Sequence, residues 1–364
     1  MEVIVTLCPY CRLVHYTTRG TERFQCSRCH SIIPVQAYEV QNYSSNVTTK
    51  TWKDSPLQKI RSPSPSSGYK AFPHESPKTA FSLFNACPRG TYGANAGKRA
   101  LICGVTYKKQ KYKLKGTLTD VYNIKDLLMN QYHFPANAIR VLTEENDPHR
   151  APTKENMEEG LRWLVKGCRP GDSLVFYFSG HGLRQPDFDN DEVDGFDETL
   201  CPVDFKTKGL ILDNDINAMI VRPLPKGVTL HAIIDACYSG TILDLEHLYS
   251  LKERRWLDNR PPSGANKCTS GGRAICFSAC RDDQMATDTS AFSQKGMSGV
   301  MTHCFIQAVL KKPRLTYFEL LSSVQENIMK TFESRCLSSK LMDKLLHRKL
   351  SQACFSFFRS HITS

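Results

Sequence analysis

The feature that most constrains the fold of this chain is a regular alternation, from about residue 97 onward, of short apolar runs with segments that carry apolar residues at helical spacing. The apolar runs, each of a length suited to a buried strand, are 98–107, 139–144, 173–182, 231–240 and 274–280. The helical segments are 120–131, 154–167, 301–312 and 316–332. Such alternation is typical of a mostly parallel sheet with helices on both faces, and it predicts an α/β fold.

Composition divides the chain into further parts. Residues 37–96, after a cysteine-rich segment at 1–36, are rich in Ser, Pro, Thr and Lys without either apolar period, which predicts a disordered linker. A polar, Gly/Pro-rich stretch at 251–273 separates residues 97–250 from residues 274–364. No run approaches the roughly 18 to 20 apolar residues that a membrane span needs. We expect a monomeric protein that does not bind membranes and resides in the cytoplasm, with the nucleus as a second compartment.

The N-terminal cysteines have the spacing of a zinc site. Cys8 and Cys11 form one pair and Cys26 and Cys29 a second, and four thiolates on two such knuckles suit tetrahedral zinc. A redox Cys-x-x-Cys is the alternative, but it needs no second pair. The neighbouring His30 could compete as a ligand, although the four cysteines complete the set. Because so small a segment cannot bury a sufficient core alone, its folding should require the metal.

The net charge of +12 is unevenly distributed. Residues 1–97 hold eleven Lys and Arg against five Asp and Glu, an excess of six that is half of the total. Such a segment suggests an acidic partner such as nucleic acid, but a solvated basic linker explains it as well. Because the sequence shows no aromatic platform of the RNA-binding kind, we disfavour nucleic acid as a partner.

Two of the predicted strands end on reactive side chains. One delivers His181 between Gly180 and Gly182, and the other delivers Cys237 within the stretch DACYSG. Ligands of open parallel sheets lie just beyond the carboxyl ends of the strands. A lone histidine or a lone buried cysteine is usually structural, but the two together, each after an apolar strand, indicate a nucleophile and its base.

The chemistry that fits this pair is hydrolysis of an amide through a thioester. Because a thiolate attacks far better than a thiol, an imidazole close to Cys237 would activate it, and His181 could then protonate the leaving amine. By analogy with acyl-transfer sites, the backbone N–H groups of Gly182 and Cys237 would hold the oxyanion.

The motifs resemble a known family. SGHG, DGFDETLCPVDF, DACYSG, SACRDDQMA and CFIQAV, within about residues 97–335, resemble metacaspases, which are caspase-like cysteine peptidases. The cysteine-rich segment with its Pro-rich linker resembles the plant type I subgroup, and the segment itself resembles the zinc finger of the plant cell-death regulators named for simulating lesions. The resemblance implies a caspase-like sheet, a large catalytic subunit at 97–250, a small one at 274–364, calcium activation, and a role in programmed cell death or stress.

Asp235 bears on specificity. An acid two residues before the nucleophile would repel acidic substrate side chains and attract Arg or Lys, and metacaspases are known for Arg or Lys at the cleaved position. The resemblance adds Asp120 to the same pocket and Ser179 to its lining. An ordinary helix N-cap is the alternative for Asp120, whereas a purely structural Asp235 would be a buried carboxylate that is costly without a partner.

Residues 187–198, DFDNDEVDGFDE, hold seven acids in twelve positions and no base, and such a run repels itself unless something positive lies within it. Carboxylate oxygens are the ligands that calcium prefers. The resemblance implies a calcium site with the ligands Asp197, Asp213, Asn214 and Asp244. Asn214 stands where the family usually has an acid, and Asp215 could substitute for it. We expect residues 187–194 to form a solvated loop.

The stretch 251–273 is expected to be an exposed loop at which the enzyme processes itself, because it contains the basic residues that the pocket would accept. The candidate cleavage residues are Arg254, Arg255, Arg260, Lys267 and Arg273. Cleavage there would separate a large fragment bearing His181 and Cys237 from a small one.

The end of the chain is atypical. Residues after about 335 do not resemble the closing segment of the family, so we expect the last strand to be missing or rebuilt. A second hypothesis therefore stays open, a catalytically slow or silent scaffold that regulates cell death through its zinc finger. The expected partners are protein substrates with Arg or Lys at the cleaved position and proteins that bind the finger.

Overall fold

The computed structural model describes a defined part of the chain. The described residues are 97–145, 147–250, 255–279, 288–289, 298–312 and 315–336, together with the strands at 3–7, 14–18, 23–25, 32–34 and 354–359. The four predicted zinc ligands Cys8, Cys11, Cys26 and Cys29, the linker at 37–96 and the cleavage candidate Arg254 lie outside the described residues. The chain divides into a small unit formed by Met1–Lys70 and Lys206–Gly209 and a large unit formed by Ala71–Phe205 and Leu210–Ser364.

The small unit contains two antiparallel hairpins. β1 (Val3–Leu7) pairs with β2 (Val14–Thr18), and β3 (Arg23–Gln25) pairs with β4 (Ile32–Pro34). In chain order, one Cys-x-x-Cys pair falls between the strands of the first hairpin and the other between those of the second. The zinc site itself stays a prediction.

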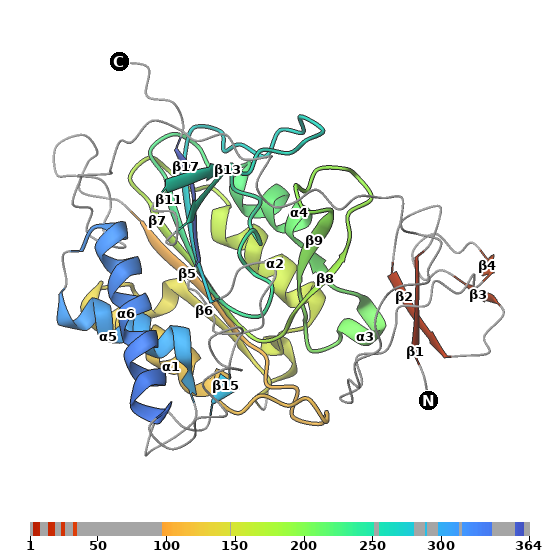
Figure 1. Cartoon of the computed structure of the whole chain (residues 1–364), viewed down its shortest axis with the longest axis horizontal. Coiled ribbons are helices and arrows are strands. Elements are labelled where there is room, and N and C mark those ends of the chain that lie inside the picture. The colour runs from red at the N-terminus through yellow and green to blue at the C-terminus, as the bar shows by residue number, and fades with distance from the viewer. Residues whose placement is uncertain are drawn as a thin grey trace. The chain divides into compact units, whose positions relative to one another are not determined.

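The large unit is built on an eight-stranded sheet with the order β13-β12-β17-β14-β11-β7-β5-β6. Its parallel strands are β5 (Lys98–Gly104), β6 (Ile139–Thr143), β7 (Ser173–Ser179), β11 (Thr229–Asp235) and β14 (Arg273–Ser278). All five lie within or against the apolar runs of the sequence, so the predicted mostly parallel α/β sheet is confirmed (Figure 1). The sheet places the carboxyl ends of β7 and β11 side by side.

One side of the sheet ends in antiparallel strands. β17 (Cys354–Arg359) lies between β14 and β12 (His247–Ser250) and runs antiparallel to both, and β13 (Arg255–Asp258) forms the edge. The last strand is therefore present with an atypical sequence, so of the two expected outcomes, missing or rebuilt, the structure excludes the first. The short aromatic run CFSFFR has the β propensity that this pairing needs, although its sequence is atypical.

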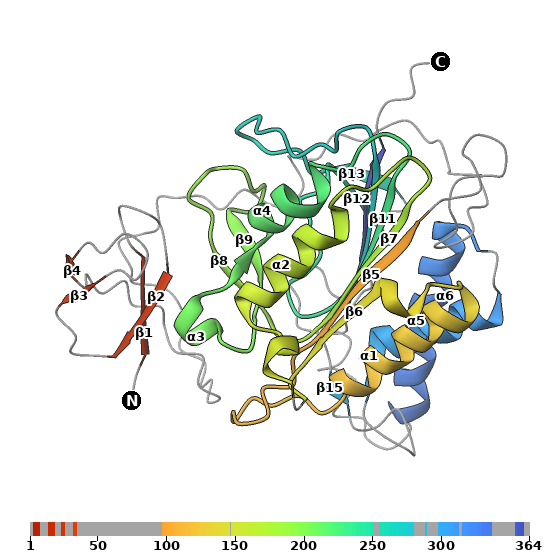
Figure 2. The ribbon, with the colours of Figure 1, turned by 180° about the vertical axis from the view of Figure 1, so that it is seen from behind.

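Helices cover both faces of the sheet (Figures 1 and 2). One face packs against α1 (Thr117–Asp126), which continues as a π-helical turn, α5 (Val300–Lys311) and α6 (Tyr317–Cys336). The other packs against α2 (Lys154–Val165) and α4 (Asp213–Ile216) with its continuation. No described helix is long and apolar enough to cross a membrane.

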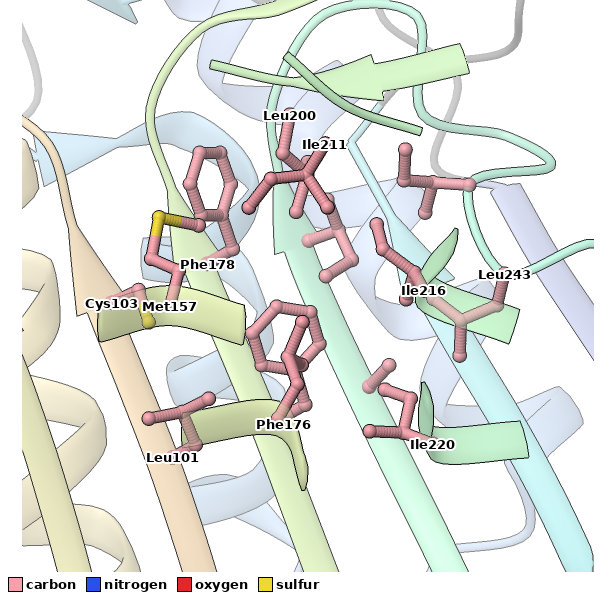
Figure 3. Close-up of a cluster of buried hydrophobic side chains, with 14 of the residues drawn as sticks. Leu101, Cys103, Met157, Phe176, Phe178, Leu200, Ile211, Ile216, Ile220 and Leu243 are labelled. Atoms are coloured by element: carbon pink, nitrogen blue, oxygen red, sulfur yellow. The ribbon is translucent and has the colours of Figure 1, made fainter. Parts of the chain in front are cut away.

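The alternation along β7 explains how one strand serves two cores. Val175 and Tyr177 join the core under α1 and α5, whereas Phe176 and Phe178 join the core under α2, where Met157 meets them (Figure 3). All are fully buried. Each such side chain contributes on the order of 1.5–3 kcal/mol to folding, so the strand that carries His181 at its end is among the most firmly held elements.

A smaller antiparallel sheet follows β7 and was not predicted from the sequence. It consists of β8 (Gly182–Pro186), β9 (Phe196–Leu200) and β10 (Ile211–Leu212). The acidic run fills the loop between β8 and β9 and continues onto β9 with Asp197 and Glu198. The remaining short elements are α3 (Phe205–Lys208), β15 (Asp288–Thr289), β16 (Ser298–Gly299) and the helical turns Ala136–Ala138 and Pro148–Arg150.

Candidate active site

The segments that follow β7 and β11 run side by side beyond the sheet. Ser179 and Asp235 are partners in the parallel register of the two strands, and the N–H of Gly180 donates to the carbonyl of Asp235 at 3.3 Å. A Cβ placed on Gly182 would overlap the carbonyl oxygen of Cys237. Only glycine permits this approach, so the structure brings both predicted oxyanion residues, Gly182 and Cys237, into backbone contact.

The ring of His181 is held by a backbone carbonyl. Its Nε2 lies 2.8 Å from the carbonyl oxygen of Tyr112, and the ring packs at 4.7 Å between centroids against Tyr107. Because a carbonyl can only accept, Nε2 must carry the hydrogen in this bond, and in the neutral imidazole Nδ1 is then the acceptor. The second ring nitrogen of His181 is thus the one suited to take a proton.

Tyr107 holds the backbone on which His181 sits. The Tyr107 hydroxyl accepts the N–H of His181 at 3.0 Å and donates to the carbonyl of Cys201 at 2.6 Å. Tyr107 itself has a φ of 52°, unusual for a residue other than glycine, and its N–H donates to Glu144 Oε2 at 2.6 Å. Sequence reasoning missed Tyr107 and Tyr112, because neither a single hydroxyl nor a backbone carbonyl leaves a motif.

Cys237 is half-buried in a turn directly after β11. The next residue, Tyr238, has a φ of 48°, and the hydroxyl of Ser239 donates to the carbonyl of Ala236 at 2.9 Å. Burial raises the pKa of the neighbouring Cys201 thiol, and Cys237 raises it further. Of these two neighbouring thiols, Cys201 is therefore kept protonated and inert, and Cys237 is the candidate nucleophile.

The two acids of the predicted pocket meet at the start of α5. Oδ2 of Asp120 accepts the N–H of Gly299 at 2.8 Å, and Oδ2 of Asp235 accepts the N–H and the hydroxyl of Thr302 at 3.1 and 2.6 Å. Both carboxylates thus bind orphan donors at the N-terminus of α5, where the helix dipole favours negative charge. Asp120 is not the N-cap of its own helix, because that position is Gly116.

Ser179 and Tyr177 lie beside these two acids. The Tyr177 hydroxyl hydrogen bonds to Thr302 Oγ1 at 2.9 Å. Burial raises the pKa of Tyr177, and the nearby charges of Asp120 and Asp235 raise it further, whereas hydrogen bonds to Thr302 and Ser179 oppose the rise. The structure therefore brings together Asp120, Ser179 and Asp235, which the sequence analysis had grouped through the family resemblance.

The acids after His181 form two groups of closely spaced oxygens. Asp187, Asp191 and Asp197 make one group, with ligand atoms all within 4.8 Å of one another, and Glu192, Asp213 and Asp244 make the other. Asp191 and Asp197 are buried, as are Asp213 and Asp244. The prediction of a solvated loop over 187–194 is therefore wrong for Asp191, which the processing segment covers, and correct for the exposed Asp189 and Asp194.

The pKa shifts show that these two groups hold more negative charge than the neighbouring cations balance. Burial raises the pKa of Asp197 to about 6 and that of Glu192 to about 12, with repulsion from neighbouring carboxylates adding to both. Burial also raises the pKa values of Asp213 and Asp244, although Lys267 opposes the rise for Asp244. Without an added cation, protons must neutralise part of the cluster.

Lys267 supplies a positive charge to these acidic groups. It is 7% exposed, and its ammonium pairs with Asp191 Oδ2 at 2.7 Å and Asp244 Oδ2 at 2.6 Å while donating to Asn214 Oδ1. The lysine thus bridges the two acidic groups. Asn214, expected as a calcium ligand, here accepts from the ammonium, and Asp215, its suggested substitute, is exposed.

The cluster nevertheless has the donor set that calcium needs. All its ligand atoms are oxygens, and Oδ1 atoms of three of its buried aspartates have no hydrogen-bond partner. These are Asp191, Asp197 and Asp244. Buried carboxylate oxygens are costly when left unpaired, and calcium accepts six to eight oxygens in flexible geometry. Asp213 and Asp244 with Glu192, and Asp197 with Asp187 and Asp191, therefore offer calcium two sets of carboxylate oxygens.

The expected processing segment is not uniformly exposed. Arg255 begins the strand β13, Lys267 is buried in the acidic cluster, and Arg273 begins the sheet strand β14. Arg260 is exposed and pairs with Asp258 at 2.6 Å, but its peptide bond leads into Pro261. The expectation of an exposed loop is therefore correct for Arg260 and for 262–266, and it is wrong for Leu257, Asn259 and Lys267, because strand pairing and the ion pairs of Lys267 hold these parts against the domain.

A mixed sheet that carries a histidine and a cysteine at the carboxyl ends of two adjacent parallel strands defines the class: this is a caspase-like α/β chain. Residues 98–246 match the family model described as "Metacaspase, peptidase C14 domain". The chain is 33% identical over 312 residues to Metacaspase-1B of Aspergillus terreus, and the match covers 73% of this chain and 82% of that one. The chain belongs to the metacaspase family.

Plant relatives are more similar in sequence over a shorter region. The chain is 52% identical over 239 residues to Metacaspase-1 of Arabidopsis thaliana, which covers 64% of this chain and 65% of that protein. It is 50% identical over 240 residues to Metacaspase-2 of the same plant, covering 65% and 57%. The chain thus spans less than two thirds of the length of these two relatives.

Proposed function

We propose that the protein is a calcium-dependent cysteine endopeptidase that cleaves after Arg or Lys with Cys237 as nucleophile and His181 as base. Family membership supports the reaction class. The observation that carries the proposal is the convergence beyond β7 and β11, which brings the backbone of Cys237 against Gly182 and two carboxylates to one helix terminus nearby.

The chain's own groups suffice for the acyl-transfer steps. His181 Nδ1 takes the proton of the Cys237 thiol, and the thiolate forms a bond to the carbonyl carbon of the substrate. The N–H groups of Gly182 and Cys237 stabilise the oxyanion. The C–N bond then breaks as His181 returns the proton to the leaving amine, and a water molecule activated by the same imidazole hydrolyses the thioester.

Specificity for basic residues is proposed to come from Asp120 and Asp235. Both carboxylates accept hydrogen bonds from the N-terminus of α5, and the hydroxyls of Ser179 and Tyr177 lie beside them. An Arg or Lys side chain would offset the repulsion between the two carboxylates, whereas an acidic side chain would add to it.

Calcium is proposed to bind at the acidic cluster through Asp197, Asp213 and Asp244, with Asn214 beside them. When bound, it would supply the positive charge that the buried carboxylates lack. The role of the chain is to hold these oxygens close together and to counter part of their charge with Lys267 and Arg184, whose guanidinium pairs with Glu198 at 3.4 Å and with Asp194.

We further propose that Cys8, Cys11, Cys26 and Cys29 bind structural zinc, that protein partners bind this finger, and that the enzyme acts in programmed cell death or stress. Of the described candidates for self-processing, Arg260 is the exposed one. Cleavage at Lys267 or Arg273 would first need the segment to leave the acidic cluster or the sheet.

The test is hydrolysis of paired peptides ending in Arg and in Asp, with and without calcium, by the full chain and by Cys237→Ala. We expect turnover of the Arg peptide, dependent on calcium and absent in Cys237→Ala. Turnover of the Asp peptide would refute the pocket, and activity retained in Cys237→Ala would refute the nucleophile. A folded chain that cuts neither peptide would support a silent scaffold instead.

A further inference from the structure

We infer that Thr241 and Glu198 form the link through which the acidic cluster positions the Cys237 turn, which makes Thr241 a positioning residue for catalysis. This inference rests on the proposed function, since it concerns how occupation of the cluster reaches the nucleophile. It assigns a role to two buried polar residues that neither hold the substrate nor belong to the proposed calcium ligands.

The nucleophile and the cluster share one short turn. Cys237 begins it and Asp244, an acid of the cluster, ends it, with Thr241 between them. The N–H of Asp244 donates to the carbonyl of Thr241 at 2.6 Å. Tyr238 and Asp244 have φ values of 48° and 50°, a region that aspartate adopts fairly often but that is unusual for a bulky residue such as tyrosine. The shape of this turn therefore depends on its contacts.

Glu198 connects the turn to the other side of the cluster. Its Oε2 accepts the hydroxyl of Thr241 at 2.7 Å, and its own N–H donates to Asp213 Oδ2 at 2.6 Å. Glu198 is fully buried on β9, and Thr241 is 5% exposed. Thr241 therefore makes two hydrogen bonds, since its carbonyl accepts the N–H of Asp244 and its hydroxyl donates to Glu198. Asp244 is itself a proposed calcium ligand, and the N–H of Glu198 donates to a second one, Asp213.

Arg184 extends the same link toward the nucleophile. It pairs with Glu198 Oε1 at 3.4 Å, and its guanidinium lies 4.3 Å from the ring centroid of Phe196 and 5.9 Å from that of Tyr238, the residue next to Cys237. Moving the carboxylates of Asp213 and Asp244 would therefore move Glu198 and Thr241 with them. The turn that presents the thiol would change shape accordingly.

The link has two consequences that a general stabilising role would not have. Thr241 donates its hydroxyl to Glu198 and not to a carboxylate of the calcium site, so its removal should leave the calcium affinity unchanged. The proposed substrate acids bind the start of α5, whereas Thr241 bonds to Glu198 and Asp244, so KM should also be unchanged. The loss should fall on kcat and on the reactivity of the Cys237 thiol.

The test compares Thr241→Val, which removes the hydroxyl at nearly constant volume, with Thr241→Ser, which keeps it. Calcium affinity is measured by calorimetry on each variant combined with Cys237→Ala. Alkylation of Cys237 by iodoacetamide is followed by mass spectrometry with and without calcium. We expect Thr241→Val to bind calcium within twofold of the unmodified chain, while the acceleration of alkylation by calcium and kcat both fall at least tenfold and KM for an Arg peptide holds. Thr241→Ser should retain both.

The outcomes separate this inference from the proposed function. Equal acceleration by calcium in Thr241→Val and the unmodified chain overturns the link and leaves the peptidase proposal standing. A parallel loss of calcium affinity in Thr241→Val also overturns it, because Thr241 would then build the site itself. Absence of calcium binding to the unmodified chain refutes both. Thr241→Ala is the second variant should valine prevent folding, and the same loss is expected of it.

Discussion

Asp120 and Asp235, which are far apart in the sequence, both direct Oδ2 at Gly299, the residue immediately before α5. A Cβ on Gly299 would overlap Asp235 Oδ2 and lie 3.1 Å from Asp120 Oδ2. α1, β11 and α5 therefore meet at one pair of carboxylates.

Gly299→Ala tests this meeting point. Gly299 has a φ of −62°, which alanine adopts readily, so the expected effect is steric: the new methyl group must displace Asp235. We expect a loss of about 1–3 kcal/mol in the free energy of unfolding and at least a tenfold fall in kcat/KM for an Arg peptide. Alkylation of Cys237 by iodoacetamide needs no basic side chain and should change much less. An Arg peptide cleaved at the unmodified rate would contradict the role given to these acids.

Tyr107→Phe tests the support of His181. The substitution leaves the N–H of His181 and the carbonyl of Cys201 without their partner in a buried place, which should lower the free energy of unfolding by about 1–3 kcal/mol. kcat should fall while KM changes little, because the imidazole loses its backbone anchor. Tyr112→Phe is the control, since it keeps the carbonyl that His181 uses. Equal effects of both variants would argue against the anchor.

Lys267→Met tests the charge balance of the acidic cluster. Removing the ammonium leaves Asp191 and Asp244 without their ion pair, so the metal-free fold should lose about 3–5 kcal/mol. The same change removes a positive charge that repels calcium, so calcium should bind more tightly and raise the melting temperature by more than in the unmodified chain. Lys226→Met, at an exposed position, should do neither. Weaker calcium binding in Lys267→Met would contradict this account.

Protonation of His231 should make the free energy of unfolding depend on pH. This residue is 1% exposed, its Nε2 hydrogen bonds to the Tyr317 hydroxyl at 2.9 Å, and burial lowers its pKa to about 3. Since the unfolded pKa is about 6.5, its stability contribution is complete above that pH and is lost as the pH falls toward 3, by up to about 1.4 kcal/mol per unit. Urea unfolding of the full chain from pH 7 to 4 should show this slope, and His231→Gln should flatten it. An unchanged slope would assign acid sensitivity to other groups.

The sheet and the positions of His181 and Cys237 at its edge could be predicted because parallel strands are buried on both faces. Their near-continuous apolar runs stand out in the sequence, and the polar residues that follow them, such as His181 and Cys237, mark the carboxyl edge. Asp235 was recognisable for the same reason, since an acid at the end of such a run needs a partner, which the structure provides in Thr302.

The supporting contacts could not be predicted because they join distant segments through groups without a pattern. His181 is held by the backbone carbonyl of Tyr112, a group that every residue has and that the sequence therefore cannot single out. The pairing of Lys267 with Asp191 depends on how one loop packs over another. Lys267 looked like an exposed cleavage residue because its neighbours are polar. Its burial follows from the carboxylates that surround it, which only the fold brings together.

The most direct test of the central claim is covalent labelling of the full chain with a peptidyl-Arg fluoromethyl ketone and its peptidyl-Asp counterpart, with calcium present, followed by mass spectrometry. Such a probe reacts only where a nucleophile and a matching pocket coincide. We predict a single adduct on Cys237 from the Arg probe, no adduct from the Asp probe, and no labelling in Cys237→Ala. An adduct on another cysteine, or faster labelling by the Asp probe, would contradict a Cys237 peptidase directed to basic residues.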